Sequence, residues 1–367
     1  MLNEISAQNL VTSTPGFTAT PASGKAGKLH GMNIIGVITP QSIFEDAMEE
    51  MTFVIPKQQT KEDLKSRRER DASTSFKERL KAFKQATEAE DAASVDIFVD
   101  RIDQVEDPEE ILQQVLEERE EPAEAWAFLD SVYEKLQEKG AAKETLEKVN
   151  SALQLLDQRY GAAIRAGVCG TLTASESYVS LGEPKVLGQT YRKAVLEFTD
   201  VLSLYSYVNE KHGGNFEQAI DFLYAALKAD VGCDLPSCEA TRLTSLNTSI
   251  GKLRSFQSAH ALCSKVMAHD NQDAATTSKK GLNLLGQLLD IGSQPFPNAS
   301  QINTVAGNFG IYQLEDRIYF LQNVLQSVRT FSPLVFDKPE GRNNTLGAVQ
   351  AAVDQAVEEE DKLLAQS

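Results

Sequence analysis

From Ser75 onward, apolar residues recur at the three- and four-residue spacing that places them on one face of an α-helix. Five such residues within residues 95–105 share a face: Val95, Phe98, Val99, Ile102 and Val105. Four aspartates line the opposite face: Asp96, Asp100, Asp103 and Asp107. No stretch of useful length alternates with the period of two that marks a strand. The pattern therefore predicts an all-α fold, an elongated array of antiparallel helical bundles joined by short turns.

Capping residues, prolines and glycines predict where these helices begin and end. Asp107 followed by Pro108 is typical of a helix start, and Pro122 begins another helix that stops at Gly140. The predicted inward residues of that second helix are Trp126, Leu129, Tyr133 and Leu136. A further amphipathic helix, residues 214–230, has a predicted inward face of Phe216, Ile220, Leu223 and Leu227. Two pairs have the three-residue offset of a capping box: Thr173 with Glu176, and Asn298 with Gln301.

Residues 1–74 differ in composition from the rest of the chain. Serine, threonine, glycine, proline and alanine dominate residues 9–31, which have too little apolar surface to offset the entropy of ordering. The prediction for residues 1–74 is therefore a disordered region. Residues 32–56 contain apolar clusters, which either become ordered on a partner or form a short helix docked on the chain's own domain.

The formal net charge of −17 is concentrated in residues 76–160, which carry 11 basic and 22 acidic side chains. This balance argues against general affinity for nucleic acid and against docking on an anionic membrane by charge alone. No apolar run approaches the roughly 20 residues of a membrane span, so no integral membrane segment is predicted. Basic proteins are the partners that the charge favours. The aspartate face is either a solvated surface or a docking site for such a partner.

The sequence offers little catalytic chemistry. It has no P-loop, no G-x-S-x-G and no H-E-x-x-H motif. A metal site can be drawn from Cys233, Cys238, His260 and Cys263, but the closest two cysteines lack the spacing of a zinc knuckle. Free cysteines are more often small buried residues, and His260 with Cys263 is an isolated pair. We therefore expect no catalytic residue, no metal and no cofactor, and the chain is predicted not to be an enzyme.

The C-terminal part has the most informative pattern: a helix ending at a glycine, a long helix ending before Pro333, an apolar tail and a last helix. The long helix has a stripe predicted to be core: Ile318, Leu321, Leu325 and Val328. Four apolar residues follow its stop: Phe331, Leu334, Val335 and Phe336. They either pack back as a cap or contact a partner, and the candidate contacts are Phe331, Leu334 and Phe336.

This order of helix stops and apolar positions resembles the type III secretion gatekeeper family, the YopN–TyeA, InvE, MxiC and HrpJ group. The matching features near the end of the chain are the sequence FLQNVLQSVRTFSPLVF, the region of Arg342 and Leu346, and QAAVDQAVEEE. Together they look like the small TyeA-type domain. Residues 158–168 resemble the turn into the family's middle domain, and residues 219–243 resemble the second half of that domain. The resemblance is only compositional in residues 1–75.

The resemblance implies four regions: 1–74 for the export signal and chaperone binding, 75–160 as an acidic helical domain, 161–280 as a middle helical domain, and 281–367 as a TyeA-like domain. It implies a non-catalytic regulator, peripheral at the inner-membrane export apparatus in the bacterial cytoplasm, that restrains late effectors and favours translocators. Some members are themselves secreted.

The implied partners are the type III export-gate protein, secretion chaperones and translocator–chaperone complexes, bound by a monomeric chain. No nucleic acid is expected among them. Two other functions stay open on the sequence alone. One is a secreted type III effector or harpin-like export substrate, and the other is a helical enzyme with an unrecognised site.

Overall fold

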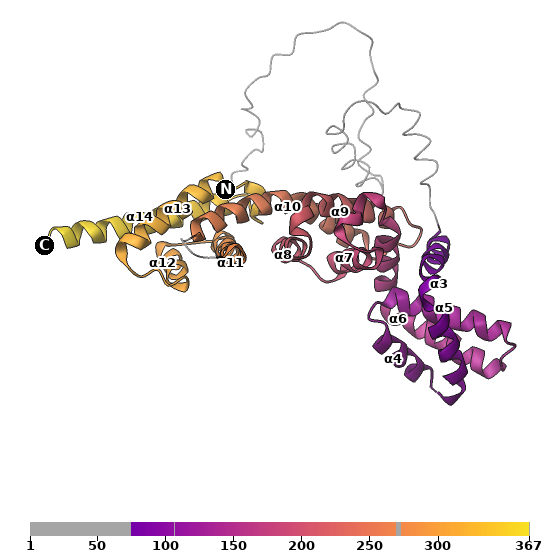
Figure 1. The fold of residues 1–367 in the computed structure, drawn as a ribbon. Coiled ribbons are helices and arrows are strands. Elements are labelled where there is room, and N and C mark those ends of the chain that lie inside the picture. Colours follow the sequence, from indigo (N-terminus) through magenta and orange to yellow (C-terminus); the bar gives the residue numbers. More distant parts are fainter. Residues whose placement is uncertain (1–74, 106, 269–272, 367) are drawn as a thin grey trace, which may run out of the picture. The chain divides into compact units, whose positions relative to one another are not determined.

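The computed structural model describes residues 75–366, apart from residue 106, residues 269–272 and the side chains of residues 88–92. In this part of the chain every regular element is a helix and no residue lies in a strand, which confirms the all-α prediction (Figure 1). The region predicted to be disordered, residues 1–74, lies outside the described residues. None of the described helices is both long enough and apolar enough to cross a membrane.

The helices at the start of the described chain pack around a first hydrophobic core. They are α3 (Phe76–Arg101), α4 (Pro108–Glu118), α5 (Pro122–Glu138) and the first part of α6 (Lys143–Thr173). The five apolar residues predicted to share a face within residues 95–105 are all buried in this core. However, α3 stops at Arg101 and a 3₁₀ turn, η1 (Ile102–Gln104), follows it. The apolar face therefore runs from the end of a helix into the turn.

The predicted helix starts at Pro108 and Pro122 are confirmed. Asp107 is the N-cap of α4, and its carboxylate accepts a hydrogen bond from the backbone nitrogen of Glu109 at 3.0 Å. Gly140, just after α5, has a φ of +66°, the left-handed conformation that glycine adopts without strain. Local capping chemistry thus sets these boundaries, as the sequence predicts.

The inward face of α5 differs slightly from the predicted one. Leu129 and Leu136 are buried as expected, whereas Trp126 and Tyr133 are only partly buried. The reason is that the buried stripe of α5 is centred on Phe128, whose ring packs edge-on against Phe98 of α3 with the centroids 5.3 Å apart. The two larger aromatic side chains flank this stripe.

Helix α6 corrects two predictions. Residues 158–168, expected to form a turn, lie inside this continuous helix, since no proline interrupts its hydrogen bonds. The predicted capping box of Thr173 and Glu176 is also wrong. Thr173 is the last residue of α6, and its hydroxyl donates to the carbonyl of Cys169 at 2.7 Å instead of capping a following helix.

The remaining helices share a second core. Those of the middle region are α7 (Pro184–Leu196), α8 (Val201–His212), α9 (Phe216–Val231) and α10 (Ala240–Met267). Those of the C-terminal region are α11 (Ala274–Ser293), α12 (Ala299–Asn308), α13 (Leu314–Thr330) and α14 (Gly341–Leu364). Short 3₁₀ turns lie between some of them: η2 (Glu176–Leu181), η3 (Gly213–Asn215) and η4 (Pro333–Val335).

Several finer predictions hold in these two regions. The capping box of Asn298 and Gln301 opens α12, with both of its hydrogen bonds present. The four residues predicted to point inward from α9 are all buried. In α13, Leu321, Leu325 and Val328 are buried, while Ile318 is only partly buried at the edge of the core. Helical periodicity alone was sufficient to find these faces.

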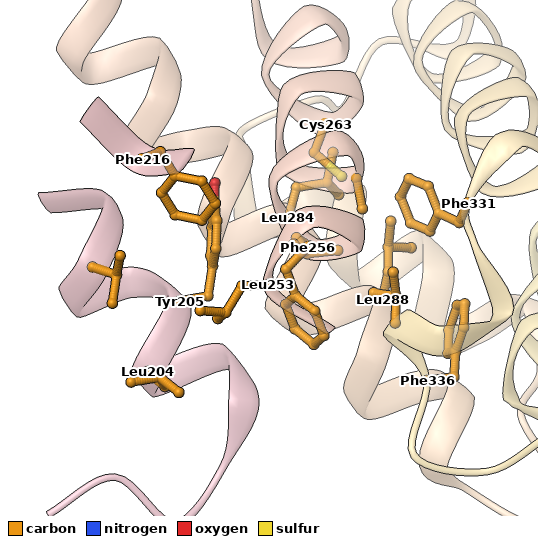
Figure 2. Close-up of a cluster of buried hydrophobic side chains, with 14 of the residues drawn as sticks. Leu204, Tyr205, Phe216, Leu253, Phe256, Cys263, Leu284, Leu288, Phe331 and Phe336 are labelled. Carbon is orange, nitrogen blue, oxygen red and sulfur yellow. The ribbon is translucent and has the colours of Figure 1, made fainter. Parts of the chain in front are cut away.

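Helix α10 belongs to both the middle and the C-terminal regions. It packs on α8 and α9 and also on α11, α13 and η4. The second core is therefore continuous, from Tyr205 of α8 through Phe256 of α10 to Phe331 and Phe336 after α13 (Figure 2). The same sharing occurs at α6, which contributes Leu156 to the first core and Cys169 to the second. The regions are joined by shared helices.

Two of the boundaries between regions that the sequence predicts, those at residues 160 and 280, fall inside helices. Position 160 lies within α6 and position 280 lies within α11. The division of the chain into four regions stays a prediction.

Helices α10 and α11 approach closely at Gly281 of α11. A Cβ atom at this position would lie 2.3 Å from Oγ and 2.7 Å from Cα of Ser264 on α10. No side chain fits in that space, so the glycine sets the distance between the two helices. The close approach lets Leu284 and Leu288 of α11 enter the core beside α10 (Figure 2).

Candidate partner-binding surfaces

The four candidate aspartates lie on three different elements. Asp96 and Asp100 are on α3, Asp103 is in η1, and Asp107 caps α4. They do not share one helical face, because α3 ends at Arg101. All four are exposed to solvent. Together they form an acidic surface, which we define by these four residues, beside the apolar face that enters the first core.

Two of these aspartates form ion pairs with α5 and the residue that follows it. A carboxylate oxygen of Asp96 lies 3.3 Å from Nζ of Lys135, and one of Asp100 lies 3.1 Å from Nζ of Lys139. The aspartate side chains are still 54% and 73% exposed, respectively. Ion pairs at this exposure are weak and exchange readily with other cations. A basic partner could therefore compete with the two lysines.

The other two aspartates have local structural roles. Asp103 accepts a hydrogen bond from the Thr145 hydroxyl of α6 at 3.1 Å, and Asp107 caps α4. Their side chains are thus held by the fold. The described residues contain no group of three or more histidine, cysteine, aspartate or glutamate side chains that could hold a metal ion. The arrangement suits electrostatic docking and holds no acid–base pair.

The apolar residues after α13 divide into buried and exposed ones. Phe331 and Phe336 are buried in the second core, with ring centroids 6.4 Å apart (Figure 2). Val335 is buried as well, whereas Leu334 is 57% exposed. The turn is fixed by Ser332, whose hydroxyl accepts a hydrogen bond from the backbone nitrogen of Leu334 at 3.3 Å. Of the three candidate contacts, only Leu334 can be reached without opening the core.

The same turn borders a groove of about 560 Å³. Its walls come from the start of α8, one side of α10, the end of α11 and residues 335–338. Lys252 of α10 and Asp337 are 3.9 Å apart, and Lys338 donates to the carbonyl of Ser293 at 2.9 Å. A molecule bound in this groove would contact both the middle and the C-terminal regions.

His260 and Cys263, considered above as a possible reactive pair, are both buried. Nδ1 of His260 lies 2.7 Å from the hydroxyl of Tyr205, and Nε2 lies 2.7 Å from the carbonyl oxygen of Ser278. Because a carbonyl only accepts, Nε2 carries a proton and donates it to the carbonyl of Ser278. Burial raises the pKa of the Cys263 thiol to about 12, so it stays protonated at neutral pH. This pair is not an activated nucleophile.

A polar cluster between α7, the end of α9 and the loop that leads to α10 has no counterpart in the sequence predictions. The buried carboxylate of Asp230 accepts hydrogen bonds from the Tyr191 hydroxyl at 2.7 Å and from the backbone nitrogen of Ser237 at 2.8 Å. Burial, together with the nearby Asp230, raises the pKa of Tyr191. On the outside of the loop, Asp234 accepts from the backbone nitrogen of Phe76 at 2.6 Å. Residue spacing gives no signal for contacts between such distant positions.

Two family models match the chain, in order along it. The model of the HrpJ-like domain matches residues 42–212, and the TyeA model matches residues 282–362. The first match begins upstream of the described residues, in a segment where the resemblance of the sequence was only compositional. No curated protein matches the chain. The two family models together span most of the sequence.

Three solved structures have partial similarity to the fold. Methylated Shigella flexneri MxiC aligns at 15% identity and a TM-score of 0.48, over 68% of this chain and 87% of MxiC. Chlamydia pneumoniae CopN aligns at 16% identity and a TM-score of 0.46, over 72% of this chain and 94% of CopN. A CopN–Scc3 complex aligns at 14% identity and a TM-score of 0.43, over 76% of this chain and 94% of the matched chain.

Proposed function

Because this chain belongs to the type III secretion gatekeeper family, we propose that it sets the order in which substrates are exported. In this proposal it is a non-catalytic protein that restrains late effectors and favours translocators and other early substrates. The observation that carries the proposal is the presence of an HrpJ-like match and a TyeA match, in order, on a single chain. The family consists of regulators of secretion.

The proposed partners are the type III export-gate protein, secretion chaperones and translocator–chaperone complexes. The chain would meet them as a monomer in the bacterial cytoplasm, at the inner-membrane export apparatus, and could itself be exported. Two surfaces support binding of more than one partner. The acidic surface favours a basic partner, and the exposed Leu334 beside the groove favours an apolar contact.

The other functions considered have less support. A secreted effector or harpin-like substrate would not need the C-terminal region that the TyeA model matches, so this alternative is not favoured. The non-catalytic part of the proposal is supported by the local chemistry. His260 is held by two core hydrogen bonds, and Cys263 is a buried, protonated thiol.

A secretion profile tests the proposal. In a strain that lacks this protein, we expect late effectors in the medium under conditions where the wild type exports translocators, with the order restored by the full chain. Each class of exported protein is quantified in the medium. If the order is unchanged and only this protein disappears from the medium, the chain is cargo. Removing the C-terminal region by ending the chain at Lys280 would be a poor test of that region, because the cut falls inside α11 and uncovers the apolar side of α10.

Reversing the charge of Asp96 and Asp100 tests the acidic surface. We expect the double change to lysine to weaken binding of a basic partner about tenfold or more, because attraction becomes repulsion. The free energy of unfolding should fall by less than about 1 kcal/mol, since both ion pairs are exposed. Binding is measured by calorimetry with the purified export-gate protein and with a translocator–chaperone complex.

The matched control changes Lys135 and Lys139 to glutamate. It breaks the same two ion pairs but makes the surface more acidic. Binding should stay as tight as in the wild type or become tighter. If both double variants weaken binding equally, the loss comes from the broken ion pairs and the docking hypothesis is wrong. If neither variant changes binding, the acidic surface is only solvated.

A further inference from the structure

A pocket of about 250 Å³ opens on the surface beside the first core, between α3 and α4. Both helices pack on α5 and α6, and the pocket lies between them. One wall is a flank of α3, where the lining residues Ser94, Ile97 and Arg101 follow helical spacing. The other wall is α4, which contributes Gln114 and Glu118, four residues apart. The pocket therefore has one helix on each side.

The floor of the pocket is apolar and already formed. It consists of Phe98, Ile102 and Val105, three residues of the first core. The ring of Phe98 packs edge-on against Phe128, and the guanidinium of Arg119 lies 4.0 Å from the centroid of the Phe128 ring. These contacts hold Phe98 in place, so a side chain can enter the pocket without rearrangement of the core.

Ile97 lies at the opening of this pocket, and 54% of its surface is exposed. Its neighbours Val95, Phe98 and Val99 on the same helix are all buried in the first core. An exposed isoleucine beside an apolar floor makes a continuous apolar surface, which suits an anchoring side chain of a partner. The size agrees, because small-molecule sites usually enclose roughly 300–1,000 Å³ and this pocket is smaller. It suits a single side chain.

Two charges of opposite sign border the pocket. The side chains of Arg101 and Glu118 are exposed, and neither has an ion pair or hydrogen bond with another described residue. Glu118 is also the last residue of α4, at the negative end of the helix dipole, and the last turn contains no basic residue. That position favours a cation from outside. The α3 wall thus presents a positive charge to an occupant, and the α4 wall a negative one.

This pocket is separate from the acidic surface. Asp96 and Asp100 pair with Lys135 and Lys139, on the α5 side of α3. The pocket lies on the α4 side, and none of the four aspartates of the acidic surface lines it. The two features can therefore be changed independently by mutation.

We propose that this pocket is a docking site for one large apolar side chain of a partner protein, flanked in the partner by an acidic and a basic residue. The apolar side chain enters between Ile97 and the floor. The acidic group of the partner faces Arg101 and its basic group faces Glu118, so the segment binds in one direction. The inference rests on the proposed function for the partners tested, the export-gate protein and a translocator–chaperone complex.

Calorimetry with these two purified partners tests the pocket in the full chain. We expect Ile97→Asp to weaken binding of a partner about tenfold or more, because a carboxylate at the opening must lose water when the apolar side chain enters. The matched control is Val179→Asp. Val179 is also an exposed apolar residue, but it belongs to η2 of the middle region and does not line the pocket. Its replacement should leave binding as in the wild type.

Exchanging the two charges gives a second test, which leaves the net charge of the chain unchanged. Combining Arg101→Glu with Glu118→Lys reverses the direction of the charge pair. We expect this double variant to weaken binding about tenfold, whereas docking by net charge alone predicts no change. Both side chains are exposed, so the variant should fold, and its melting temperature checks this. It therefore decides the question if Ile97→Asp does not accumulate.

The proposal is overturned if the charge-exchange variant binds as tightly as the wild type. It is also overturned if Val179→Asp weakens binding as much as Ile97→Asp does, or if the wild-type chain binds neither partner. Failure of the proposed function looks different. In that case the strain without the protein keeps the wild-type order of export, while the differences in binding among these variants remain.

Discussion

Replacing Gly281 with alanine is expected to lower the free energy of unfolding by about 3 kcal/mol. The added Cβ would lie within 2.7 Å of the backbone nitrogen and Cα of Ser264, and a backbone cannot move aside as the end of a flexible side chain can. Helices α10 and α11 must therefore separate, and the core residues between them lose contacts. Urea unfolding followed by circular dichroism measures the change.

Gly347 provides the matched control. It lies on the exposed side of α14, and a Cβ there would have no atom within 4 Å. Alanine at this position should raise the free energy of unfolding by about 0.5–1 kcal/mol, because it restricts the unfolded chain and favours the helix. If Gly281→Ala and Gly347→Ala have the same free energy of unfolding, the close approach of α10 and α11 does not control stability.

Replacing Phe336 with alanine is expected to lower the free energy of unfolding by about 3–5 kcal/mol. The ring is buried between Phe331, Gly292 and Gly341, and the two glycines have no side chain that could fill the cavity. Leu334, two residues earlier, is mostly exposed, so Leu334→Ala should change stability by no more than about 0.5 kcal/mol. Thermal and urea unfolding of the two variants give the comparison.

This pair also separates a partner contact from a core contact. A secretion defect in Phe336→Ala alone would follow from lost protein, and its level in the cell should fall in parallel. A defect in Leu334→Ala at a normal protein level would indicate a partner at the exposed turn. If Leu334→Ala exports each class in the wild-type order, Leu334 is not a contact for the partner that sets the order.

Much of the fold could be predicted because its causes are local. The cap at Asp107, the capping box at Asn298 and the buried stripe of α13 each depend on residues within a few positions. The errors occurred where a local signal competed with helix continuation. At Thr173 the hydroxyl bonds back into the last turn of α6, and near residue 160 no proline interrupts the helix, which accommodates Gly161 in its interior.

The candidate surfaces could be predicted only in part, because their chemistry depends on distant partners. The spacing of the aspartates shows that they are exposed, but Lys135 and Lys139 come from another helix. The tail after α13 reads as uniformly apolar, yet the η4 turn buries Phe336 and exposes Leu334. The contact of Asp234 with Phe76 joins a loop position to the first residue of α3, and the two share no sequence pattern. Tertiary structure decides each of these cases.

The shared helix α10 has a consequence for how the chain can be divided. A break between Ala268 and Asp273 would fall between α10 and α11 and leave both helices whole. Each fragment would then carry an apolar face shaped for the other, with Gly281 on one side and Ser264 on the other. Such fragments would behave as an obligate heterodimer and not as two independent proteins. If two separate genes encoded these fragments, the two proteins would have to be synthesised together.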